Sequence, residues 1–327
     1  MNDKGTQEKE CIEMKRLVST VNLSKEEWLK YRKTGITGTD AGAICGLNPY
    51  SSAFQVYQDK ITDDIEKFDN ESMRQGRDFE EYVAQRFTEE TGLKVRRANA
   101  IYQNEEHPFM LADFDRLVVG TPDGVKAGLE CKTVSPYSSD KWKDGEIPLH
   151  YQMQVQHYLA VSGYDCWYIA ALIFGREFII RKIERDEELI QYLITIEEKF
   201  WNDNVIARVM PEPDGSTNCS EMIAKMYFNS NREKSIPLYG YNQILNRREE
   251  LDELIKKLEK EKTEIEQKIK LELKDATYGT TEEYRVSWAS FEQTRLDSKK
   301  LKSEHPDIYE QYSRKSSSRR FTVSHAA

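Results

Sequence analysis

The sequence has no pair of closely spaced cysteines and no long apolar run. Its 327 residues include five cysteines, which are scattered and odd in number. Zinc knuckles and iron–sulfur clusters need clustered cysteines, so this pattern argues against both and fits reduced thiols in a cytoplasm. No stretch approaches the roughly 18 apolar residues of a membrane span, and the polar N-terminus has no apolar signal-peptide core. We therefore expect a cytoplasmic protein without a membrane segment.

Basic charge is also in deficit. The 48 lysines and arginines are outnumbered by 57 aspartates and glutamates, which gives a net charge of −9. This balance argues against a protein that coats nucleic acid with its whole surface, but it allows a local basic groove. The short run KVRRAN contains Lys94, Arg96 and Arg97, which are either groove residues or the solvated end of a strand.

Composition along the chain predicts four segments. Residues 1–20 are expected to be a mobile tail, and an α/β domain is expected at 21–209. The run MPEPDGSTN opens a predicted linker at 210–240, because proline, glycine and aspartate interrupt regular structure. A C-terminal extension follows at 241–327. It contains a long amphipathic helix at 244–275, with apolar residues at three- and four-residue spacing, and short strands in YRVSWASFEQTRLD and RRFTV.

Periodicity within the α/β domain predicts the order α-β-β-β-α-β-β-α over residues 71–205. An earlier helix should begin near Ser24, because SKEE is a capping-box pattern. Helices are expected at 71–91, 147–163 and 186–205. The runs RRANAIYQ, FMLADFDRLVVG and AGLECKTVS are each predicted as one strand. This order is typical of a mixed α/β domain, of the α+β type, with one central sheet.

The segment LECKTVS, residues 129–135, places a carboxylate and an ammonium side by side. In a strand, Glu130 and Lys132 point to one face and the small or apolar residues point to the other. Asp115 lies fifteen residues before Glu130, a length that lets a hairpin bring both carboxylates together. Two carboxylates and a backbone carbonyl suit a hard cation such as Mg²⁺. A lysine beside them suits phosphoryl transfer, which needs a cation, an activated water and a cationic partner.

The same pattern also fits an ordinary surface ion pair, worth about 0–1 kcal/mol. Three further residues favour a site. Glu80, on the edge of an apolar helix face, is either a surface acid or an additional metal-site acid. Gln154 is either solvated or orients a water or a phosphate. Arg32 precedes a Gly-rich turn, and arginine binds phosphate through two hydrogen bonds. His157, a lone helix histidine, is interpreted as structural.

Five motifs occur in the order W-x3-R-x2-GIT, G-x2-FE, D-RLV, LECK and Y-x2-QVQ-YL-V-G, over about residues 24–205. This order resembles the YqaJ-like viral recombinase nucleases, which are similar to phage lambda-type exonucleases of the PD-(D/E)xK superfamily. The resemblance implies a restriction-endonuclease-like core with a central mixed β-sheet flanked by helices. It also implies a helical C-terminal extension with a small β element. The segment 21–209 would then be the nuclease domain.

The resemblance assigns roles residue by residue. Asp115 and Glu130 match the metal ligands of the family, with the main-chain carbonyl of Cys131 as a third ligand. Lys132 matches the catalytic lysine. Glu80 matches the helix acid at the metal site.

Two further matches concern DNA and water. Gln154 matches the glutamine of the QxxxY-type motif, and Arg32 matches the arginine that contacts the terminal 5′ phosphate of DNA. Thr39 stands where the family usually has serine, so a hydroxyl is kept. Phe114 replaces the proline that often precedes the ligand aspartate, a change that affects the strand rather than the chemistry. Asp113, expected on the same face, is a second candidate for that ligand, although DRLV favours the later aspartate.

The resemblance implies a Mg²⁺- or Mn²⁺-dependent DNA exonuclease, 5′→3′ on double-stranded ends, that leaves 3′ single strands for phage-type recombination in a bacterial cell. Implied partners are DNA ends, a RecT-like single-strand annealing recombinase and further copies of the chain in a ring. One alternative is a non-catalytic DNA-end or recombinase-binding adaptor, which the complete acidic–lysine set disfavours. Another is a RecB- or Cas4-like or endonucleolytic member of the superfamily, although the missing cysteine cluster argues against the Cas4 type.

Overall fold

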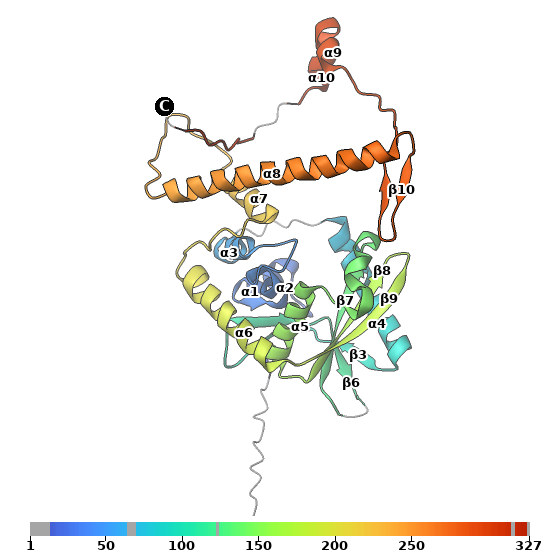
Figure 1. The fold of residues 1–327 in the computed structure, drawn as a ribbon. Helices are drawn as coiled ribbons and strands as arrows, with labels where there is room; N and C mark the ends of the chain where they lie inside the picture. Colours follow the sequence, from blue (N-terminus) through green and yellow to red (C-terminus); the bar gives the residue numbers. More distant parts are fainter. Residues whose placement is uncertain (1–13, 64–69, 122–123, 315–317, 326–327) are drawn as a thin grey trace, which may run out of the picture. The chain divides into compact units, whose positions relative to one another are not determined.

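Two compact units make up the chain, Met1–Met226 and Tyr227–Ala327, and both are drawn in Figure 1. The boundary falls inside the predicted linker at 210–240. A helix at Thr217–Met226 lies within that segment and belongs to the first unit, where Asn218 accepts a hydrogen bond from the Ser52 hydroxyl (2.8 Å). The computed structural model describes residues 14–63, 70–121, 124–314 and 318–325.

The first unit contains most of the regular elements. They are β1 (Lys15–Ser19), α1 (Lys25–Lys33), β2 (Ile36–Thr37), α2 (Gly38–Ile44), α3 (Ala53–Ile61), α4 (Glu71–Thr91), β3 (Lys94–Arg97), β4 (Ala100–Gln103), β5 (Met110–Asp113), β6 (Arg116–Val119), β7 (Ala127–Val134), a 3₁₀ segment (Pro136–Gly145), α5 (Leu149–Ser162), β8 (Cys166–Ile173), β9 (Glu177–Glu184), α6 (Glu187–Lys199), a π-helical segment (Phe200–Ile206) and α7 (Thr217–Met226). No helix among the described residues is long and apolar enough to cross a membrane.

A five-stranded sheet with the order β3-β6-β7-β8-β9 forms the centre of this unit. β6 and β7 are antiparallel, whereas β7 and β8 are parallel and are joined through α5 (Figure 1). A parallel pair needs such a crossover connection, because a tight turn reverses the chain direction and can join only antiparallel strands. This mixed sheet flanked by helices confirms the predicted mixed α/β class. It is the central sheet expected of a restriction-endonuclease-like core.

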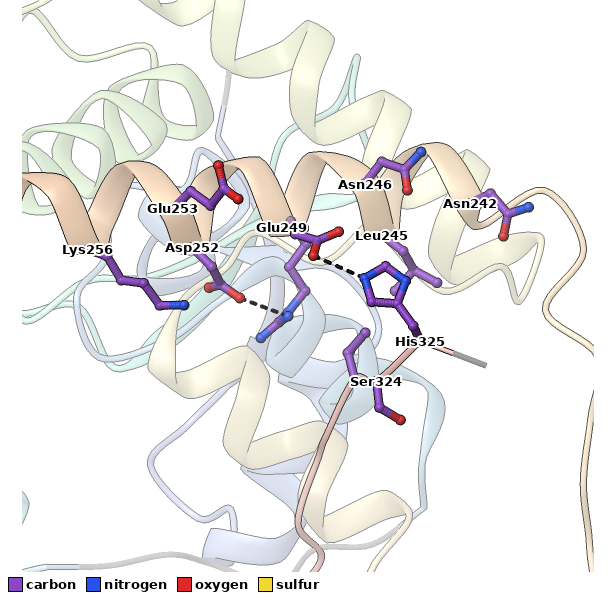
Figure 2. A pocket seen from close by; sticks show the side chains of 11 residues that line it. Asn242, Leu245, Asn246, Glu249, Asp252, Glu253, Lys256, Ser324 and His325 are labelled. Carbon is purple, nitrogen blue, oxygen red and sulfur yellow. Dashed lines mark hydrogen bonds and ion pairs between the residues drawn. The ribbon is translucent and has the colours of Figure 1, made fainter. Parts of the chain in front are cut away.

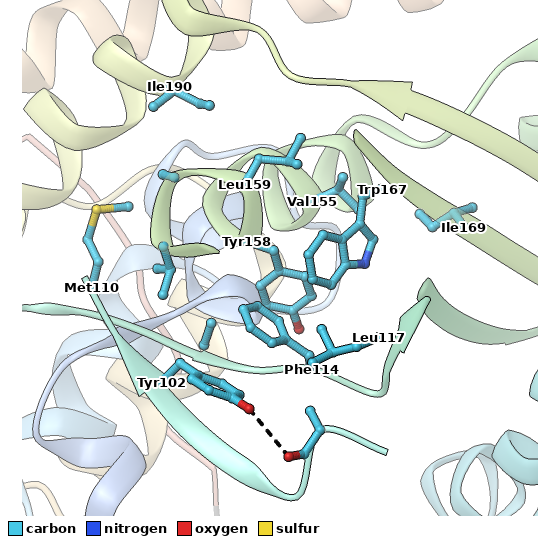
Figure 3. Packing of buried hydrophobic residues seen from close by; sticks show 14 of the residues in the cluster. Tyr102, Met110, Phe114, Leu117, Val155, Tyr158, Leu159, Trp167, Ile169 and Ile190 are labelled. Atoms are coloured by element: carbon cyan, nitrogen blue, oxygen red, sulfur yellow. Dashed lines mark hydrogen bonds between the residues drawn. The ribbon is translucent and has the colours of Figure 1, made fainter. Parts of the chain in front are cut away.

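Alternation along β7 directs its side chains into two cores. On one face, Leu129 packs with Val83 and Phe87 of α4. On the other face, Trp167 of β8 packs with Val155 of α5 in the cluster shown in Figure 3. Each fully buried side chain of this size stabilises the fold by about 1.5–3 kcal/mol. β7 is therefore held between α4 and α5, and its polar residues cannot change faces.

A second sheet, with the order β1-β4-β5-β2, corrects the prediction of one central sheet. RRANAIYQ and FMLADFDRLVVG each divide into two strands that belong to different sheets. The first division falls at Asn99, whose φ of +53° interrupts an extended strand. The second falls at Phe114, whose ring packs against Tyr102, Tyr158 and Trp167. Alternation of apolar and polar residues does not distinguish one long strand from two short ones.

Strand β1 corrects part of the predicted mobile tail over residues 1–20. It pairs antiparallel with β4, with Ser19 opposite Ala100. The sequence KRLVS is short and charged, so its strand conformation depends on its partner rather than on propensity. Residues 1–13, the rest of the predicted tail, lie outside the described residues.

The ends of the helices agree with local sequence signals more closely than the ends of the strands do. The expected capping box is formed, because the Ser24 hydroxyl accepts from the Glu27 N–H (3.2 Å) and the Glu27 carboxylate accepts from the Ser24 N–H (2.9 Å). α5 ends at Gly163, whose φ is +65°. The helix predicted at 186–205 is α6 followed by the π-helical segment.

The second unit confirms the long helix predicted at 244–275 and the small β element. RRFTV, predicted as a strand, is irregular, and two short helices were not predicted. None of the described residues of this unit is buried. Its elements are α8 (Asn242–Leu273), β10 (Tyr278–Thr280), β11 (Arg285–Ser287), α9 (Ser298–Glu304) and α10 (Pro306–Tyr312).

Candidate active site

The β6–β7 hairpin brings Asp115 and Glu130 together. Arg116 pairs with Leu129 across the two strands, so the residue before Arg116 lies beside the residue after Leu129. Asp115 Oδ2 also accepts a hydrogen bond from the backbone N–H of Cys131 (2.8 Å). The proximity that we predicted from the fifteen-residue spacing is therefore present in the structure.

Lys132 and Gln154 complete a cluster around Glu130. Lys132 Nζ lies 2.7 Å from Glu130 Oε1 and donates to Gln154 Oε1 (3.0 Å). Gln154 Nε2 in turn donates to Glu130 Oε1 (2.7 Å) and to the hydroxyl of Tyr158 (2.8 Å). The Lys132 ammonium also lies 4.6 Å from the centre of the Tyr151 ring. Both tyrosines therefore contact the charged cluster.

One carboxylate oxygen of Glu130 has no hydrogen-bond partner within the described part of the chain. Only 5% of its side chain is exposed, and Oε2 is buried with no hydrogen-bond partner among the described residues. A buried, unpaired carboxylate oxygen carries a desolvation cost of about 1–3 kcal/mol or more. Carboxylate oxygens are the ligands that hard cations prefer. The donor chemistry of Asp115 and Glu130 therefore fits Mg²⁺ or Mn²⁺.

Electrostatics within the cluster are also unbalanced. Burial raises the pKa of Asp115 well above its ordinary value, and the nearby charges of Glu130 and Glu80 raise it further. Burial lowers the pKa of Lys132, but the charges of Glu130, Tyr151 and Asp115 and the hydrogen bond to Glu130 together more than offset this effect, so the pKa is raised overall. Lys132 therefore stays an ammonium, and the acids repel one another beyond what this single cation offsets.

Glu80 is held by a cation that sequence reasoning missed. Arg116, which is 3% exposed, forms an ion pair with Glu80 of α4 and donates to Glu81 (3.0 Å) and to the carbonyl oxygen of Asp115 (2.7 Å). Within the described ranges, no three His, Cys, Asp or Glu side chains form a ready metal cluster. Glu80 thus lies next to the site but is paired with Arg116. The only sequence signal for Arg116 is its place in DRLV.

Cys131 separates the two charged residues of β7 and points the other way. Its side chain packs against the cluster of Val83 and Phe87 from α4. Burial raises the pKa of the Cys131 thiol far above its ordinary value, so the thiol is unreactive. The four cysteines within the described part of the chain are all free, as the sequence predicts.

A second polar cluster forms around Arg32 of α1. Its guanidinium donates to the hydroxyls of Thr37 (3.1 Å) and Thr39 (2.9 Å), and lies 4.6 Å from the centre of the Trp28 ring. Asp113 lies 3.9 Å from this guanidinium and accepts from Trp28 Nε1 (2.6 Å). The structure therefore brings together Arg32 and Thr39, the two residues predicted to contact a phosphate. Thr37 and Trp28 join them.

Asp113 has its direct contacts in the Arg32 cluster. Burial, followed by the charges of Glu130 and Glu80, raises the pKa of Asp113, so it also lies close to the acids around Asp115. β5 ends at Asp113 and β6 begins in the other sheet, so strand alternation does not continue between them. Tyr158 links the two clusters, because its hydroxyl bonds to Gln154 and lies 3.5 Å from the Asp113 carbonyl oxygen. One buried tyrosine thus connects the acidic–lysine cluster with the arginine cluster.

His157 lies in the core, as the structural interpretation predicted. Its Nδ1 is 2.9 Å from Glu197 Oε1, and its Nε2 is 2.9 Å from the carbonyl oxygen of Leu111. Both ring nitrogens face acceptors, an arrangement that suits the doubly protonated ring. Burial lowers the pKa of His157, but the Glu197 carboxylate, the Leu111 carbonyl and the charge of Asp40 together raise it more. Sequence reasoning missed Glu197, because an acid in an amphipathic helix gives no sign of burial.

Similarity to known proteins assigns the chain to a family. Residues 27–165 match the YqaJ-like viral recombinase domain. The chain is 39% identical over 311 residues to the uncharacterized protein YqaJ of Bacillus subtilis (strain 168). The match covers 94% of this chain and 96% of that protein. The chain therefore belongs to the YqaJ-like viral recombinase family.

Two solved structures are more distantly similar. The alkaline exonuclease LHK-Exo of Laribacter hongkongensis is 20% identical, with a TM-score of 0.48, over 62% of this chain and 99% of that chain. A phage-related exonuclease of Haemophilus somnus 129PT is 15% identical, with a TM-score of 0.41, over 55% of this chain and 99% of that chain. The family assignment rests on the domain match and the Bacillus relative.

Proposed function

We propose that this protein is a metal-dependent deoxyribonuclease that digests double-stranded DNA from its ends. The observation that carries this proposal is the cluster of Asp115, Glu130, Lys132 and Gln154, with one buried carboxylate oxygen that lacks a partner among the described residues. An ordinary surface ion pair would be solvated, whereas this cluster is largely enclosed. Membership of a viral recombinase family supports DNA recombination as its setting.

Mg²⁺, with Mn²⁺ as the alternative, suits the oxygen donors of this cluster. Asp115 and Glu130 would hold it with their carboxylates. The backbone carbonyl of Cys131 is the third donor that we propose. Its N–H points at Asp115, and the N–H and C=O of a strand residue point to the same side. Glu80 would join only by leaving Arg116. When bound, the cation would activate a water and neutralise charge on the scissile phosphate.

The protein's own residues supply the rest of the chemistry. Lys132 presents an ammonium between Glu130 and Gln154, where it would stabilise negative charge that develops on the phosphate or on the attacking water. Gln154 fixes one oxygen of Glu130 and would orient the water. Tyr158 holds Gln154 in place from the next turn of α5.

Arg32 and Thr39 are the proposed contacts for the terminal 5′ phosphate. Thr39 is exposed and 21% of the Arg32 side chain is exposed, so both are accessible to a ligand. Charge-assisted hydrogen bonds from a guanidinium favour phosphate. Capture of a 5′ end would give 5′→3′ digestion and leave 3′ single strands. These strands would suit a RecT-like annealing recombinase in the cytoplasm of a bacterial cell, and copies of the chain would form a ring around the DNA.

Linear and closed circular duplexes of one sequence test this proposal. With Mg²⁺, the wild-type protein should digest the linear duplex and leave the circle intact. Lys132→Ala should slow linear digestion by about 10²–10³-fold, the range for loss of one group that stabilises charge in the transition state, and should still bind DNA. Lys199→Ala, an exposed lysine on α6, is the matched control and should keep the wild-type rate.

Three results would contradict the proposal. Cleavage of the circle would indicate an endonuclease. Wild-type digestion by Lys132→Ala would remove that lysine from the mechanism. DNA binding without digestion by the wild-type protein, in Mg²⁺ and in Mn²⁺, would indicate the adaptor.

A further inference from the structure

Helix α8 carries an exposed apolar seam with a heptad pattern. Positions along the seam are separated alternately by four and three residues, the spacing by which two helices pack side by side. The seam covers about three and a half heptads, which is within the range that supports a coiled coil. Its residues are Ile244, Arg248, Leu251, Ile255, Leu258, Lys262, Ile265 and Ile269.

The six apolar residues of this seam are 38–64% exposed. A helix gains most of its stability from packing an apolar face, yet α8 has no buried residue. The C-terminal residues 323–325 lie against a neighbouring face of α8, where His325 bonds to Glu249 (3.1 Å), as Figure 2 shows. Of the seam residues, only Arg248 lines that pocket. Among the residues that the structure describes, none therefore buries the apolar part of the seam.

We propose that α8 of a second copy of this chain covers the seam, and that the two helices run antiparallel. The two cations in the seam decide the direction. In a parallel pair, Arg248 would face Arg248 and Lys262 would face Lys262, and these like charges repel. In an antiparallel pair with Ile255 opposite Leu258, the heptad spacing places Arg248 opposite Ile265. The same register places Lys262 opposite an apolar residue, Leu251.

The antiparallel register also places an acid beside each seam cation. Glu266 of the second copy lies next to Arg248, and Asp252 of the second copy lies next to Lys262. Within one chain, Arg248 already pairs with Asp252 (2.9 Å), and Glu266 already pairs with Lys262 (3.9 Å) and Lys270 (3.8 Å). Asp252 would therefore be shared by two cations and Glu266 by three. The long stems of arginine and lysine can cover apolar surface while their charges reach the edge.

The contact would be modest in strength. At about 1.5 Å per residue, the span Ile244–Ile269 is roughly 39 Å long. Two polar positions weaken a coiled coil but fix its register and orientation. We therefore expect a dimer contact that depends on protein concentration. It does not rest on the proposed nuclease activity.

Cysteine pairs in the full-length chain test the direction. Leu251→Cys and Lys262→Cys face each other only across an antiparallel pair. Under mild oxidation, an equimolar mixture of the two variants should give a disulfide-linked dimer. Each variant alone should stay at the background level of the wild-type protein, which has its own five cysteines. Cross-linking of Leu251→Cys alone to the level of the mixture would overturn the proposal, and so would a mixture without cross-links.

A second substitution separates seam packing from chance collision. Leu258→Glu, added to both cysteine variants, should lower the yield of cross-linked dimer about tenfold or more, because it brings carboxylates into the apolar seam. Leu271→Glu is the matched control, since Leu271 is 73% exposed on the same helix but lies outside the seam. Its yield should stay unchanged. Equal yields for both glutamate variants, with helicity retained, would also overturn the proposal.

Discussion

Two glutamates of the first unit, Glu130 and Glu197, show how neighbours decide a residue's role. Glu197 is fully buried, and both of its oxygens lie within hydrogen-bond distance of His157. Glu130 is nearly as buried, but Lys132 and Gln154 both contact the same oxygen and leave the other unpaired among the described residues. A buried charge needs full compensation to be merely structural. Glu197 meets this condition, whereas Glu130 lacks one partner and fits a ligand site.

Arg32 is the residue on which the predicted polarity depends. Arg32→Ala should reduce the preference for 5′-phosphorylated over 5′-hydroxyl DNA ends by about 10–100-fold, because a hydrogen bond to a charged group contributes about 1.5–3 kcal/mol. The ratio of digestion rates on the two kinds of linear duplex measures this preference. Arg86→Ala, which removes an ion pair with Glu90 on α4, should keep the ratio. An unchanged ratio for Arg32→Ala would place the phosphate elsewhere.

The His157–Glu197 pair should make stability depend on pH. The pKa of His157 is raised above 6.5 in the folded protein, so the pair stabilises fully below that value. Its contribution is then lost as pH rises through the folded pKa. The free energy of unfolding of the wild type, relative to the double variant His157→Gln with Glu197→Gln, should therefore fall as the pH rises above 6.5 and through the folded-state pKa. Urea unfolding at several pH values measures this difference. A difference that does not change with pH would show that the two side chains are uncharged in the folded protein, which would contradict the prediction.

At the scale of elements, β7 decides the geometry of the site. It carries Glu130 and Lys132 on the face toward α5, while Leu129 fixes the opposite face against α4. The parallel register places Gly128 beside Trp167 of β8. Only a residue without a side chain leaves space for that indole ring. Packing on both sides of β7 therefore sets the position of the charged residues between them.

A pair of glycine substitutions tests this packing. Gly128→Ala would place a Cβ within the Trp167 ring, and we expect the free energy of unfolding to fall by about 1–3 kcal/mol or more, as for other overpacked cores. Gly76→Ala, in α4, has its nearest atom at 3.7 Å on Thr133, and should raise stability by up to about 1 kcal/mol. Urea unfolding compares the two variants. Equal changes would show that Trp167 relaxes freely around a new methyl group.

For the whole molecule, the two units differ in how they are stabilised. All four clusters of buried hydrophobic residues lie in the first unit. The described residues of the second unit include many exposed aromatic side chains, such as Trp288 and Phe291, and none that is buried. The first unit therefore has its own core. The second unit gains stability from local hydrogen bonds and from any partner that packs against its exposed surfaces.

A chain that ends after Met226 should keep the fold of the first unit. Its thermal midpoint should stay within about 5 °C of the full-length value, since about 1 kcal/mol shifts the midpoint of a domain of this size by 2–4 °C. A shorter chain that ends after Lys199 removes Phe200 and Val205 from a core cluster, and should unfold at a clearly lower temperature. Scanning calorimetry of the three chains gives this comparison. A large loss after Met226 would mean that the second unit supports the first.

The sequence by itself determined the local structure and the close contacts of the site. Caps and periodicity located most helices of the first unit and α8, since these signals act within a few residues. The spacing between Asp115 and Glu130 predicted their approach, because a hairpin is a local structure. The alternation of LECK placed Glu130 and Lys132 on one face. Family motifs then indicated Gln154 as a residue of the site and Arg32 as a contact of the 5′ phosphate.

Only the tertiary structure decided what lies between these local pieces. It divided two predicted strands between two sheets, and it gave Asp113 its direct contact with Arg32. It also placed Arg116 on Glu80 and made Tyr158 the link between the clusters. The physical reason is that such contacts join residues far apart in the chain. Burial and long-range packing select them, and neither leaves a periodic signal in the sequence.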